Sequence, residues 1–182
     1  FFITLHYKAD MIKNFFGNGD KWGVKIEYIY ENKPLGTAGS LGLLPKNLDN
    51  LPIIVMNGDV LTTIPFEKLL DFHSEQGGQA TVCVREYDFQ VPFGVVATEG
   101  SKVMKIEEKP VHSFFVSAGI YVLDPSIIKN IEPDVYIDMP HFLTDLIESG
   151  SELSAFPIHE YWMDIGREDD FYQAQSDIIN LH

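Results

Sequence analysis

Apolar residues in the first half of the chain fall into short runs that alternate with amphipathic segments. The runs at 1–5, 24–30 and 53–56 predict strands. Residues 9–16 carry apolar side chains at helical spacing and predict a helix that ends at 17–19, where two glycines flank an asparagine. The run at 53–56 is continuous rather than alternating, which is typical of a parallel strand buried on both faces.

The remaining sequence continues this alternation and adds antiparallel features. Glu99-Gly100 stands between two β-rich runs and predicts a hairpin over 93–106. Further strands are predicted at 80–85, 114–123, 153–158 and 161–165, and helices at 40–44, 66–73, from 125, at 140–148 and from 168. We therefore expect one α/β domain over residues 1–182, with a mixed, mostly parallel sheet and helices on both of its faces.

Composition narrows the possible classes of function. Thirteen Lys and Arg stand against 27 Asp and Glu, which gives a net charge of −14. Such a balance argues against nucleic acid and anionic membranes as partners. The single cysteine, Cys83, lies in an apolar run and predicts a core residue rather than a nucleophile. Without a disulfide framework the chain fits a reducing compartment, so we expect a cytoplasmic protein. No apolar run approaches the roughly 20 residues of a membrane span.

Asn57-Gly58-Asp59 directly follows the apolar run at 53–56. Ligands of open α/β sheets bind at the carboxyl ends of the strands, and an unpaired carboxylate buried there would be costly. Asp59 is therefore a candidate Mg²⁺ ligand, and the alternative is a turn former or an N-cap of the next helix. Gly58 would let the backbone bend or a ligand approach closely.

Asp164 repeats this arrangement at the end of the apolar run over 161–165. Two acids at strand ends could meet across a sheet and hold one Mg²⁺, which prefers carboxylates together with substrate phosphates. The alternative is that Asp164 caps the last helix.

Glu107-Glu108-Lys109-Pro110 follows a predicted strand. Pro110 is expected to keep Lys109 extended, where its ammonium group could hold a phosphate as a point charge. Glu108 could accept hydrogen bonds from sugar hydroxyls. The alternative is a solvated charged turn.

Glycines mark three further places. The loop over 34–39 could aim backbone N–H groups and a helix N-terminus at a nucleotide, or it could be an ordinary glycine-rich turn. Gly94 and the glycine of Ser117-Ala118-Gly119 lie inside predicted strands, which indicates a bulge or a close ligand approach. Neither GxxxxGK[ST] nor GxGxxG occurs in the sequence.

Six of these segments, taken in order, resemble the sugar-1-phosphate nucleotidyltransferases, also called nucleotide-sugar pyrophosphorylases. The nearest likeness is to the mannose-1-phosphate guanylyltransferase-like branch. The segments are ENKPLGTAGSL (31–41), VMNGD (55–59), PFGVV (92–96), EEKP (107–110), SAGIYVL (117–123) and YWMDIG (161–166). The resemblance covers essentially the whole chain. It implies a Rossmann-like fold and a Mg²⁺-dependent reaction that joins a nucleoside triphosphate to a sugar 1-phosphate and releases pyrophosphate.

The resemblance also implies roles for individual residues. Asp59 and Asp164 would bind Mg²⁺, and Lys109, the third catalytic residue, would hold the sugar phosphate. The substrate-binding residues would be Glu31, Pro34, Gly36 and Thr37 at the base and ribose, Glu108, Gly94 and Gly119 at the sugar, and Asn57, Gly58 and Ser117 beside them. A carboxylate at Glu31 could pair with guanine N1–H and N2–H₂, which favours GTP. The sugar stays open among mannose-, heptose- and amino-sugar-type 1-phosphates.

The family's glycine-rich GGxGxRL loop, which wraps the triphosphate, does not occur among the 182 residues. We therefore expect an N-terminally truncated domain that lacks the family's first strand, loop and helix and is inactive by itself. A CBS-domain segment upstream and a homo-oligomer remain open, because part of this branch carries CBS domains and the sheet would expose an apolar side. The alternatives are a catalytically silent regulatory or sugar-nucleotide-binding module, and a plain α/β interaction domain. The presence of Asp59, Lys109 and Asp164 together favours the enzyme.

Overall fold

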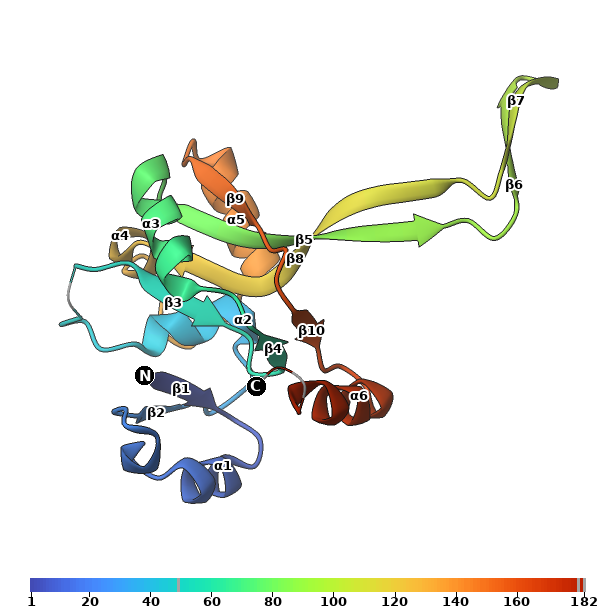
Figure 1. The fold of residues 1–182 in the computed structure, drawn as a ribbon. Coiled ribbons are helices and arrows are strands. Elements are labelled where there is room, and N and C mark those ends of the chain that lie inside the picture. Colours follow the sequence, from blue (N-terminus) through green and yellow to red (C-terminus); the bar gives the residue numbers. More distant parts are fainter. Residues whose placement is uncertain (49, 180, 182) are drawn as a thin grey trace. The chain divides into compact units, whose positions relative to one another are not determined.

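A computed structural model describes residues 1–48, 50–179 and 181 of the chain. The protein is a mixed α/β fold with parallel and antiparallel strand pairs (Figure 1), which confirms the predicted fold class. The elements are β1 (Phe2–Leu5), α1 (Ala9–Phe16), η1 (Asp20–Trp22), β2 (Glu27–Tyr30), α2 (Gly36–Gly39), η2 (Ser40–Leu43), β3 (Ile53–Met56), β4 (Val60–Thr62), α3 (Phe66–Gln76), β5 (Ala80–Gln90), β6 (Gly94–Glu99), β7 (Lys102–Glu108), β8 (Val111–Leu123), α4 (Pro125–Ile128), α5 (Met139–Glu148), β9 (Leu153–Pro157), β10 (Trp162–Asp164) and α6 (Glu168–Ile178).

The residues form two compact units, each built from three segments of the chain. The first unit comprises Phe1–Ile54, Gln76–Ala80 and Val122–Leu153, and the second comprises Val55–Glu75, Thr81–Tyr121 and Ser154–His182. The expectation of a single domain over 1–182 stays a prediction. Each unit is described by itself below.

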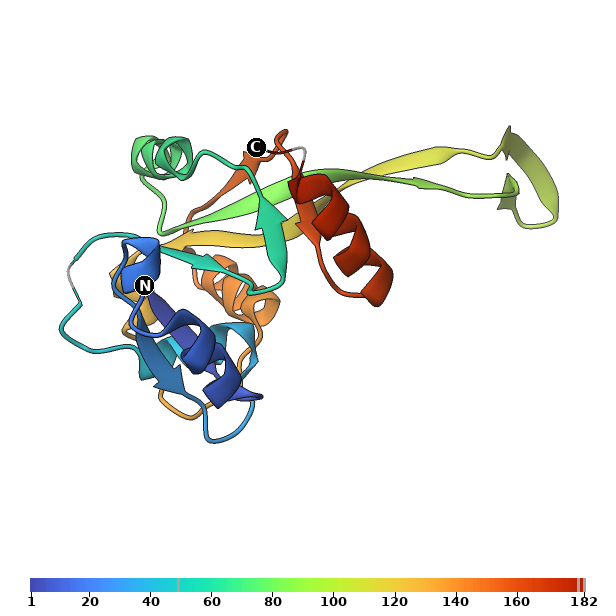
Figure 2. The same ribbon diagram turned by 60° about the horizontal axis from the view of Figure 1, so that its bottom comes forward.

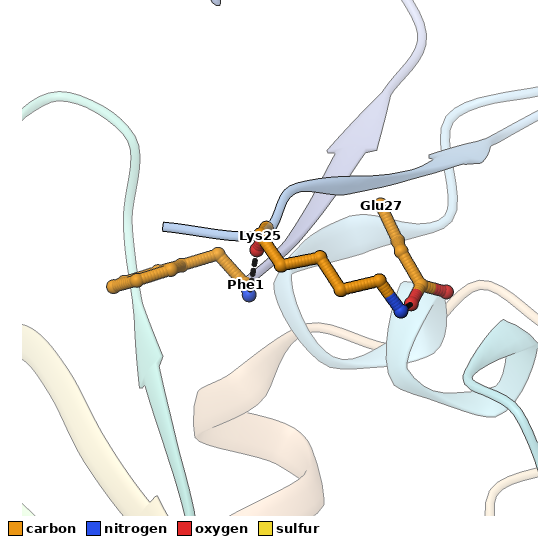
Figure 3. Close-up of polar contacts among 3 residues, drawn as sticks. All are labelled: Phe1, Lys25 and Glu27. Carbon is orange, nitrogen blue, oxygen red and sulfur yellow. Dashed lines mark hydrogen bonds and ion pairs between the residues drawn. The ribbon is translucent and has the colours of Figure 1, made fainter. Parts of the chain in front are cut away.

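In the first unit, β1 and β2 form a parallel pair that runs from Phe2 opposite Glu27 to Leu5 opposite Tyr30. At the start of this pair the Phe1 nitrogen donates to the Lys25 carbonyl oxygen at 2.6 Å, and Lys25 Nζ contacts Glu27 Oε1 at 2.5 Å (Figure 3). The core of this unit lies mainly between the α2–η2 turn and helices α4 and α5. Its buried apolar residues include Leu35, Ala38, Leu41, Ile127, Ile128, Ile131, Met139, Phe142 and Leu143.

The second unit holds most of a four-stranded sheet with the strand order β3-β8-β5-β9. It also holds two antiparallel pairs, β4 with β10 and β6 with β7. Strands β5 and β8 run side by side, and their outer ends carry the β6–β7 hairpin (Figures 1 and 2). The buried residues of the second unit include Val60, Ile64, Leu69, Thr81, Cys83, Ala118, Ile120, Tyr121, Ile158 and Ala174.

Several element boundaries differ from those expected from the sequence. Strand β2 begins at Glu27 rather than at residue 24, because Val24 and Ile26 donate their N–H groups to the preceding turn at Gly19 and Asn18. Strand β4 was not predicted, since three residues after a turn carry little periodic signal. Strands β5 and β8 extend beyond the predicted 80–85 and 114–123, because each continues along the other.

Candidate functional site

Several predicted site residues meet in the second unit, and we call Asn57, Gly58, Asp59, Ser117, Gly119 and Asp164 the strand-end cluster. Residues 57–59 form the turn between β3 and β4. Strand β10 pairs with β4 so that Asp164 lies opposite Val60, and the Ile165 N–H donates to the Asp59 carbonyl oxygen at 2.9 Å. The two aspartates, far apart in sequence, are therefore neighbours across one short ladder.

Both aspartates are exposed, beside the buried residues Val60 and Ala118. From the sequence, Asp59 was expected to be costly to bury without a partner. Because its side chain is exposed, that cost does not arise. Exposed carboxylate oxygens suit a hard cation that keeps several waters and takes its other ligands from a substrate. Among the described residues no three His, Cys, Asp or Glu side chains are grouped to hold a metal. The donor chemistry of this pair fits Mg²⁺ held by two carboxylates, without an all-protein cage.

Gly119 on β8 contacts the turn at Asn57 within the strand-end cluster. The Asn57 N–H donates to the Gly119 carbonyl oxygen at 2.9 Å, and the backbone of Gly119 has φ of +69°. A Cβ atom at this position would lie 2.8 Å from Asn57 Nδ2. Both the backbone angle and the close approach therefore require glycine here. Ser117 Oγ and Tyr121 OH share a hydrogen bond of 2.9 Å on the same strand.

Two residues beside Asp164 hold this region together, although the reasoning from sequence assigned them no role. The indole N–H of Trp162 donates to the Ala118 carbonyl oxygen at 2.8 Å, which ties β10 to β8. The Tyr161 hydroxyl donates to Asp177 Oδ2 at 2.7 Å, which ties the end of the preceding loop to α6. Burial and this hydrogen bond raise the pKa of Tyr161 to about 12. Tyr161 and Trp162 belong to the YWMDIG motif, and this membership was the only signal in the sequence that could have pointed to them.

Gly94, Glu108 and Lys109 form a second group at the base of the β6–β7 hairpin. Gly94 pairs with Glu108, and a Cβ atom on Gly94 would lie 3.1 Å from Glu108 Oε2. Lys109 has φ of +47°, so the expectation that Pro110 keeps it extended is wrong. The chain turns here from β7 into β8, and the Lys109 N–H donates to the Phe93 carbonyl oxygen at 3.3 Å, which holds the turn.

The hairpin group lies apart from the strand-end cluster within the second unit. In both views the hairpin stands at the far end of β5 and β8 from β4 and β10 (Figures 1 and 2). All residues of β6 and β7 are exposed. The structure thus brings the two predicted metal ligands together, but it does not bring the predicted phosphate-binding lysine to them.

The predicted base- and ribose-binding loop lies in the first unit and is held by its own neighbours. Glu31 Oε2 accepts the Leu35 N–H at 3.0 Å, and Thr37 Oγ1 accepts the Met139 N–H at 2.7 Å at the start of α5. Gly36 has φ of +76°, and a Cβ atom there would lie 2.5 Å from the Ile137 carbonyl oxygen. Pro34 is exposed at the edge of the loop.

Two N–H groups of α2 are engaged within the protein. Ala38 and Gly39 both donate to the Ile137 carbonyl oxygen, at 2.9 and 3.0 Å. These two groups are therefore not available to a nucleotide, and nucleotide binding by the loop through Gly36 and Thr37 stays a prediction. The loop packs against the segment that leads into α5, and this contact explains its small residues.

Cys83 is fully buried, which confirms that it is a core residue. Burial raises the pKa of its thiol to about 12, so the nucleophilic thiolate is disfavoured. Among the described helices, none combines the length and apolarity that crossing a membrane requires.

The mixed α/β fold and the order of the site motifs along the chain are typical of one family of enzymes. A family model described as nucleotidyl transferase matches residues 1–180. The chain therefore belongs to the nucleotidyl transferase family, which confirms the family expected from the motifs.

Individual relatives narrow the likeness. The chain is 34% identical to a mannose-1-phosphate guanyltransferase of Aspergillus fumigatus over 93% of its length and 48% of the relative. It is 38% identical to the enzyme of the same name from Debaryomyces hansenii, over 83% of the chain and 43% of the relative. The chain thus spans about half the length of the curated relatives it matches.

Solved structures show the same relationship. HddC from Yersinia pseudotuberculosis is 27% identical with a TM-score of 0.72, and the match covers 97% of this chain and 77% of that one. Its complex with GMP-PN is matched at 25% identity and a TM-score of 0.71, with the same coverage.

Proposed function

We propose that the complete protein transfers a nucleoside monophosphate from a nucleoside triphosphate, with GTP favoured, to a sugar 1-phosphate. The observation that carries the proposal is that Asp59 and Asp164 lie beside each other at one end of the β4–β10 ladder. The names of the relatives, mannose-1-phosphate guanyltransferases, and the GMP-PN complex of HddC support the nucleotide and the acceptor class.

In this proposal Asp59 and Asp164 would hold Mg²⁺ through their carboxylates. When bound, the cation supplies positive charge that relieves repulsion between two phosphorylated substrates. A phosphate oxygen of the sugar 1-phosphate bonds to the α-phosphorus, and the bond from that phosphorus to the bridging oxygen breaks. Pyrophosphate leaves with the electron pair. No protein nucleophile takes part, so the residues act by positioning and by charge.

The remaining residues act by binding. Lys109 neutralises the sugar phosphate, while Glu108 accepts hydrogen bonds from sugar hydroxyls. In this proposal Gly94 and Gly119 line the sugar pocket, Gly94 close to the Glu108 carboxylate and Gly119 close to the Asn57 amide. Glu31 uses one oxygen on the Leu35 N–H, and its carboxylate has acceptor capacity left for guanine N–H groups.

A second candidate is a silent sugar-nucleotide-binding module, and one observation favours it for these 182 residues alone. The β6–β7 hairpin, which Lys109 follows, stands apart from β4 and β10 in this structure (Figure 1). No GGxGxRL triphosphate loop occurs between residues 1 and 182. We therefore propose that the 182 residues alone do not turn over substrate. Pyrophosphate release from GTP and mannose 1-phosphate by these residues alone would refute this part.

The main test is made in the complete gene product, with Asp59→Asn and Asp164→Asn. Each variant should lose at least about a thousandfold in kcat/KM, because lost charge stabilisation of several kcal/mol costs tenfold per 1.36 kcal/mol. Asp169→Asn is the matched control, an exposed acid in the first turn of α6, and should stay within about threefold.

A readout independent of turnover separates the two candidates. Binding of Mn²⁺ in place of Mg²⁺, measured by electron paramagnetic resonance, should be lost in Asp59→Asn and Asp164→Asn but kept in Asp169→Asn. Near-normal rates with unchanged Mn²⁺ binding would contradict the two-aspartate site. Binding of GTP without turnover by the complete wild-type protein would favour the silent module.

A further inference from the structure

Arg85 makes two side-chain hydrogen bonds that the site described above does not use. It lies half-buried on β5, and its Nη1 atom donates to the carbonyl oxygens of Ile158, at 3.2 Å, and Glu160, at 2.7 Å. Both partners are backbone oxygens, since the Glu160 carboxylate accepts the His159 N–H at 3.1 Å. A charged donor strengthens a hydrogen bond, so Arg85 fixes the course of the backbone over 158–160.

The segment that Arg85 holds connects two different sheets. Strand β9 is an edge of the four-stranded sheet and lies next to β5, whereas β10 has β4 as its ladder partner among the described residues. The chain crosses from one sheet to the other through residues 158–161. Ile158 anchors the start of this crossing, because it is buried and its N–H donates to the Val84 carbonyl oxygen at 2.8 Å. Arg85 extends the anchor to Glu160, two residues before β10 begins.

The β4–β10 ladder gives its own register little support. It comprises only the pairs from Trp162 opposite Thr62 to Asp164 opposite Val60, and isolated two-stranded pairs are marginally stable. A slip of β10 by one residue would turn every side chain of this strand to the opposite face. Asp164 would then leave the face on which it lies beside Asp59. Whatever fixes the course of the chain into β10 therefore fixes the place of Asp164.

A hydrogen bond of Trp162 depends on the same register. Trp162 and Asp164 are two positions apart on β10, so their side chains share one face. The indole N–H of Trp162 donates to the carbonyl oxygen of Ala118, a fully buried residue of β8. A slip by one residue would turn the indole away from this carbonyl and break the bond. The indole hydrogen bond therefore reports whether Asp164 lies on its observed face.

We propose that Arg85 is a positioning residue, which sets the register of β10 and thus the place of Asp164 beside Asp59. It acts through the backbone over 158–160 rather than on a substrate, and the importance of this placement for catalysis rests on the proposed function. Arginine suits the role because its planar guanidinium group carries only donors and stays charged at every working pH.

Nuclear magnetic resonance of the Trp162 indole tests the register without any ligand, in the complete gene product labelled with ¹⁵N-tryptophan. The loss of one resonance in Trp162→Phe assigns it. Its indole N–H should exchange with water at least about tenfold faster in Arg85→Met than in the wild type, because β10 then opens more often. Lys68→Met is the matched control, which removes the same charge from an exposed position of the same unit, and it should change the rate less than about threefold.

Metal binding connects the register to the proposed site. Mn²⁺ binding by the complete gene product, measured by electron paramagnetic resonance, should weaken at least about tenfold in Arg85→Met and less than about threefold in Lys68→Met. Arg85→Lys keeps a charged donor, so it should recover part of both losses. Circular dichroism selects conditions in which each variant is folded, so that a general loss of stability does not change either readout. If Arg85→Met does not fold, Arg85→Gln replaces it, with expected changes of at least about threefold because one neutral donor group remains.

An unchanged indole exchange rate in Arg85→Met, or an equal change in Lys68→Met, would overturn the proposal. Normal Mn²⁺ binding in Arg85→Met beside lost binding in Asp164→Asn would also overturn it, because Asp164 would then keep its place without the arginine. If Asp164→Asn itself binds Mn²⁺ as the wild type does, the proposed function fails, and the indole exchange still decides whether Arg85 sets the register.

Discussion

The strand-end cluster and the β6–β7 hairpin belong to the same unit, but very different surroundings hold them in place. At the cluster, hydrogen bonds from Asn57 to Gly119, from Ile165 to Asp59 and from Trp162 to Ala118 join three strands. The hairpin is held by its own two strands and by β5 and β8, and every residue of β6 and β7 is exposed.

The proposed transfer reaction would use both regions, one to position phosphate groups and the other to bind the sugar phosphate. The aspartates lie on a backbone fixed from several sides, which would suit the proposed Mg²⁺ site with its two protein ligands. Lys109 and Glu108 sit on an exposed ribbon, and two-stranded ribbons are marginally stable without further packing.

Hydrogen exchange should show the largest difference between the two regions. In dilute protein, the amides of Asn57 and Ile165 should exchange at least about 100-fold more slowly than those of β6 and β7, because buried cooperative segments open less often than exposed ribbons. Mass spectrometry on peptides from both regions measures this. Equal protection of the amides in both regions would contradict the view that the strand-end cluster is held more firmly than the hairpin.

The second-largest effect should be a difference in unfolding free energy between two glycine-to-alanine variants, one in each region. Gly119→Ala combines φ of +69° with a Cβ atom 2.8 Å from Asn57 Nδ2, whereas Gly100→Ala in the hairpin turn has φ of +60° and nothing within 4 Å. Gly100→Ala should cost about 1 kcal/mol of unfolding free energy from backbone strain alone. Gly119→Ala should cost about 2–4 kcal/mol, because overpacking adds to the strain.

Urea unfolding at neutral pH measures both costs. Asn57→Ala in the Gly119→Ala background should recover part of the loss, because it removes the side chain that the new Cβ atom meets. If the two single variants lost equal stability, the crowding at Gly119 would be unimportant.

The smallest expected effects are those of pH, and they have opposite directions in the two regions. The pKa of Tyr161 is about 12 in the folded protein, above its usual value of 10.0, so the fold favours the neutral phenol. Its contribution to stability is complete below pH 10.0 and is lost as the pH rises towards about 12. Urea unfolding across this range should show a steeper loss in the wild type than in Tyr161→Phe. Equal slopes would mean that burial and the Asp177 hydrogen bond do not favour the neutral phenol of Tyr161 in the folded protein.

On the hairpin, the hydrogen bond and charge of Lys105 lower the pKa of Glu107 below its usual 4.5. The contribution of this pair is present above pH 4.5 and is lost as the pH falls through the lowered pKa. Both side chains are well exposed, so salt should screen the effect. In unfolding measurements, Lys105→Ala should differ from the wild type only at low ionic strength. A difference that persists in high salt would show that the pair is more enclosed than the structure shows.

Much of the fold follows from local pattern. The helix at 9–16, the hairpin around Glu99-Gly100 and the helix opened by the acids after Arg167 all lie where spacing, turn residues and capping place them. The ordered motifs also indicated the family, because each carries several residues at fixed spacing. The pairing of Asp59 with Asp164 was anticipated as two strand ends that meet.

Other features depend on contacts between distant segments, and the sequence could not determine them. Strand β4 has only three residues and exists because it pairs with β10. Lys109 adopts a positive φ in the turn where it contacts Phe93, against the extended preference that Pro110 imposes locally. Thr37, which seemed free to face a ligand in the sequence, accepts a hydrogen bond from Met139, 102 positions further along the chain.

The sequence by itself therefore determined which residues are chemically capable and which short elements carry them, because periodicity and turn chemistry act over a few neighbours. Only the tertiary structure decided which of those residues stand together. It brings the two aspartates together at a ladder between distant strands, and it leaves the lysine at the base of an exposed hairpin. Long-range pairing depends on the whole arrangement of strands, which no local window contains.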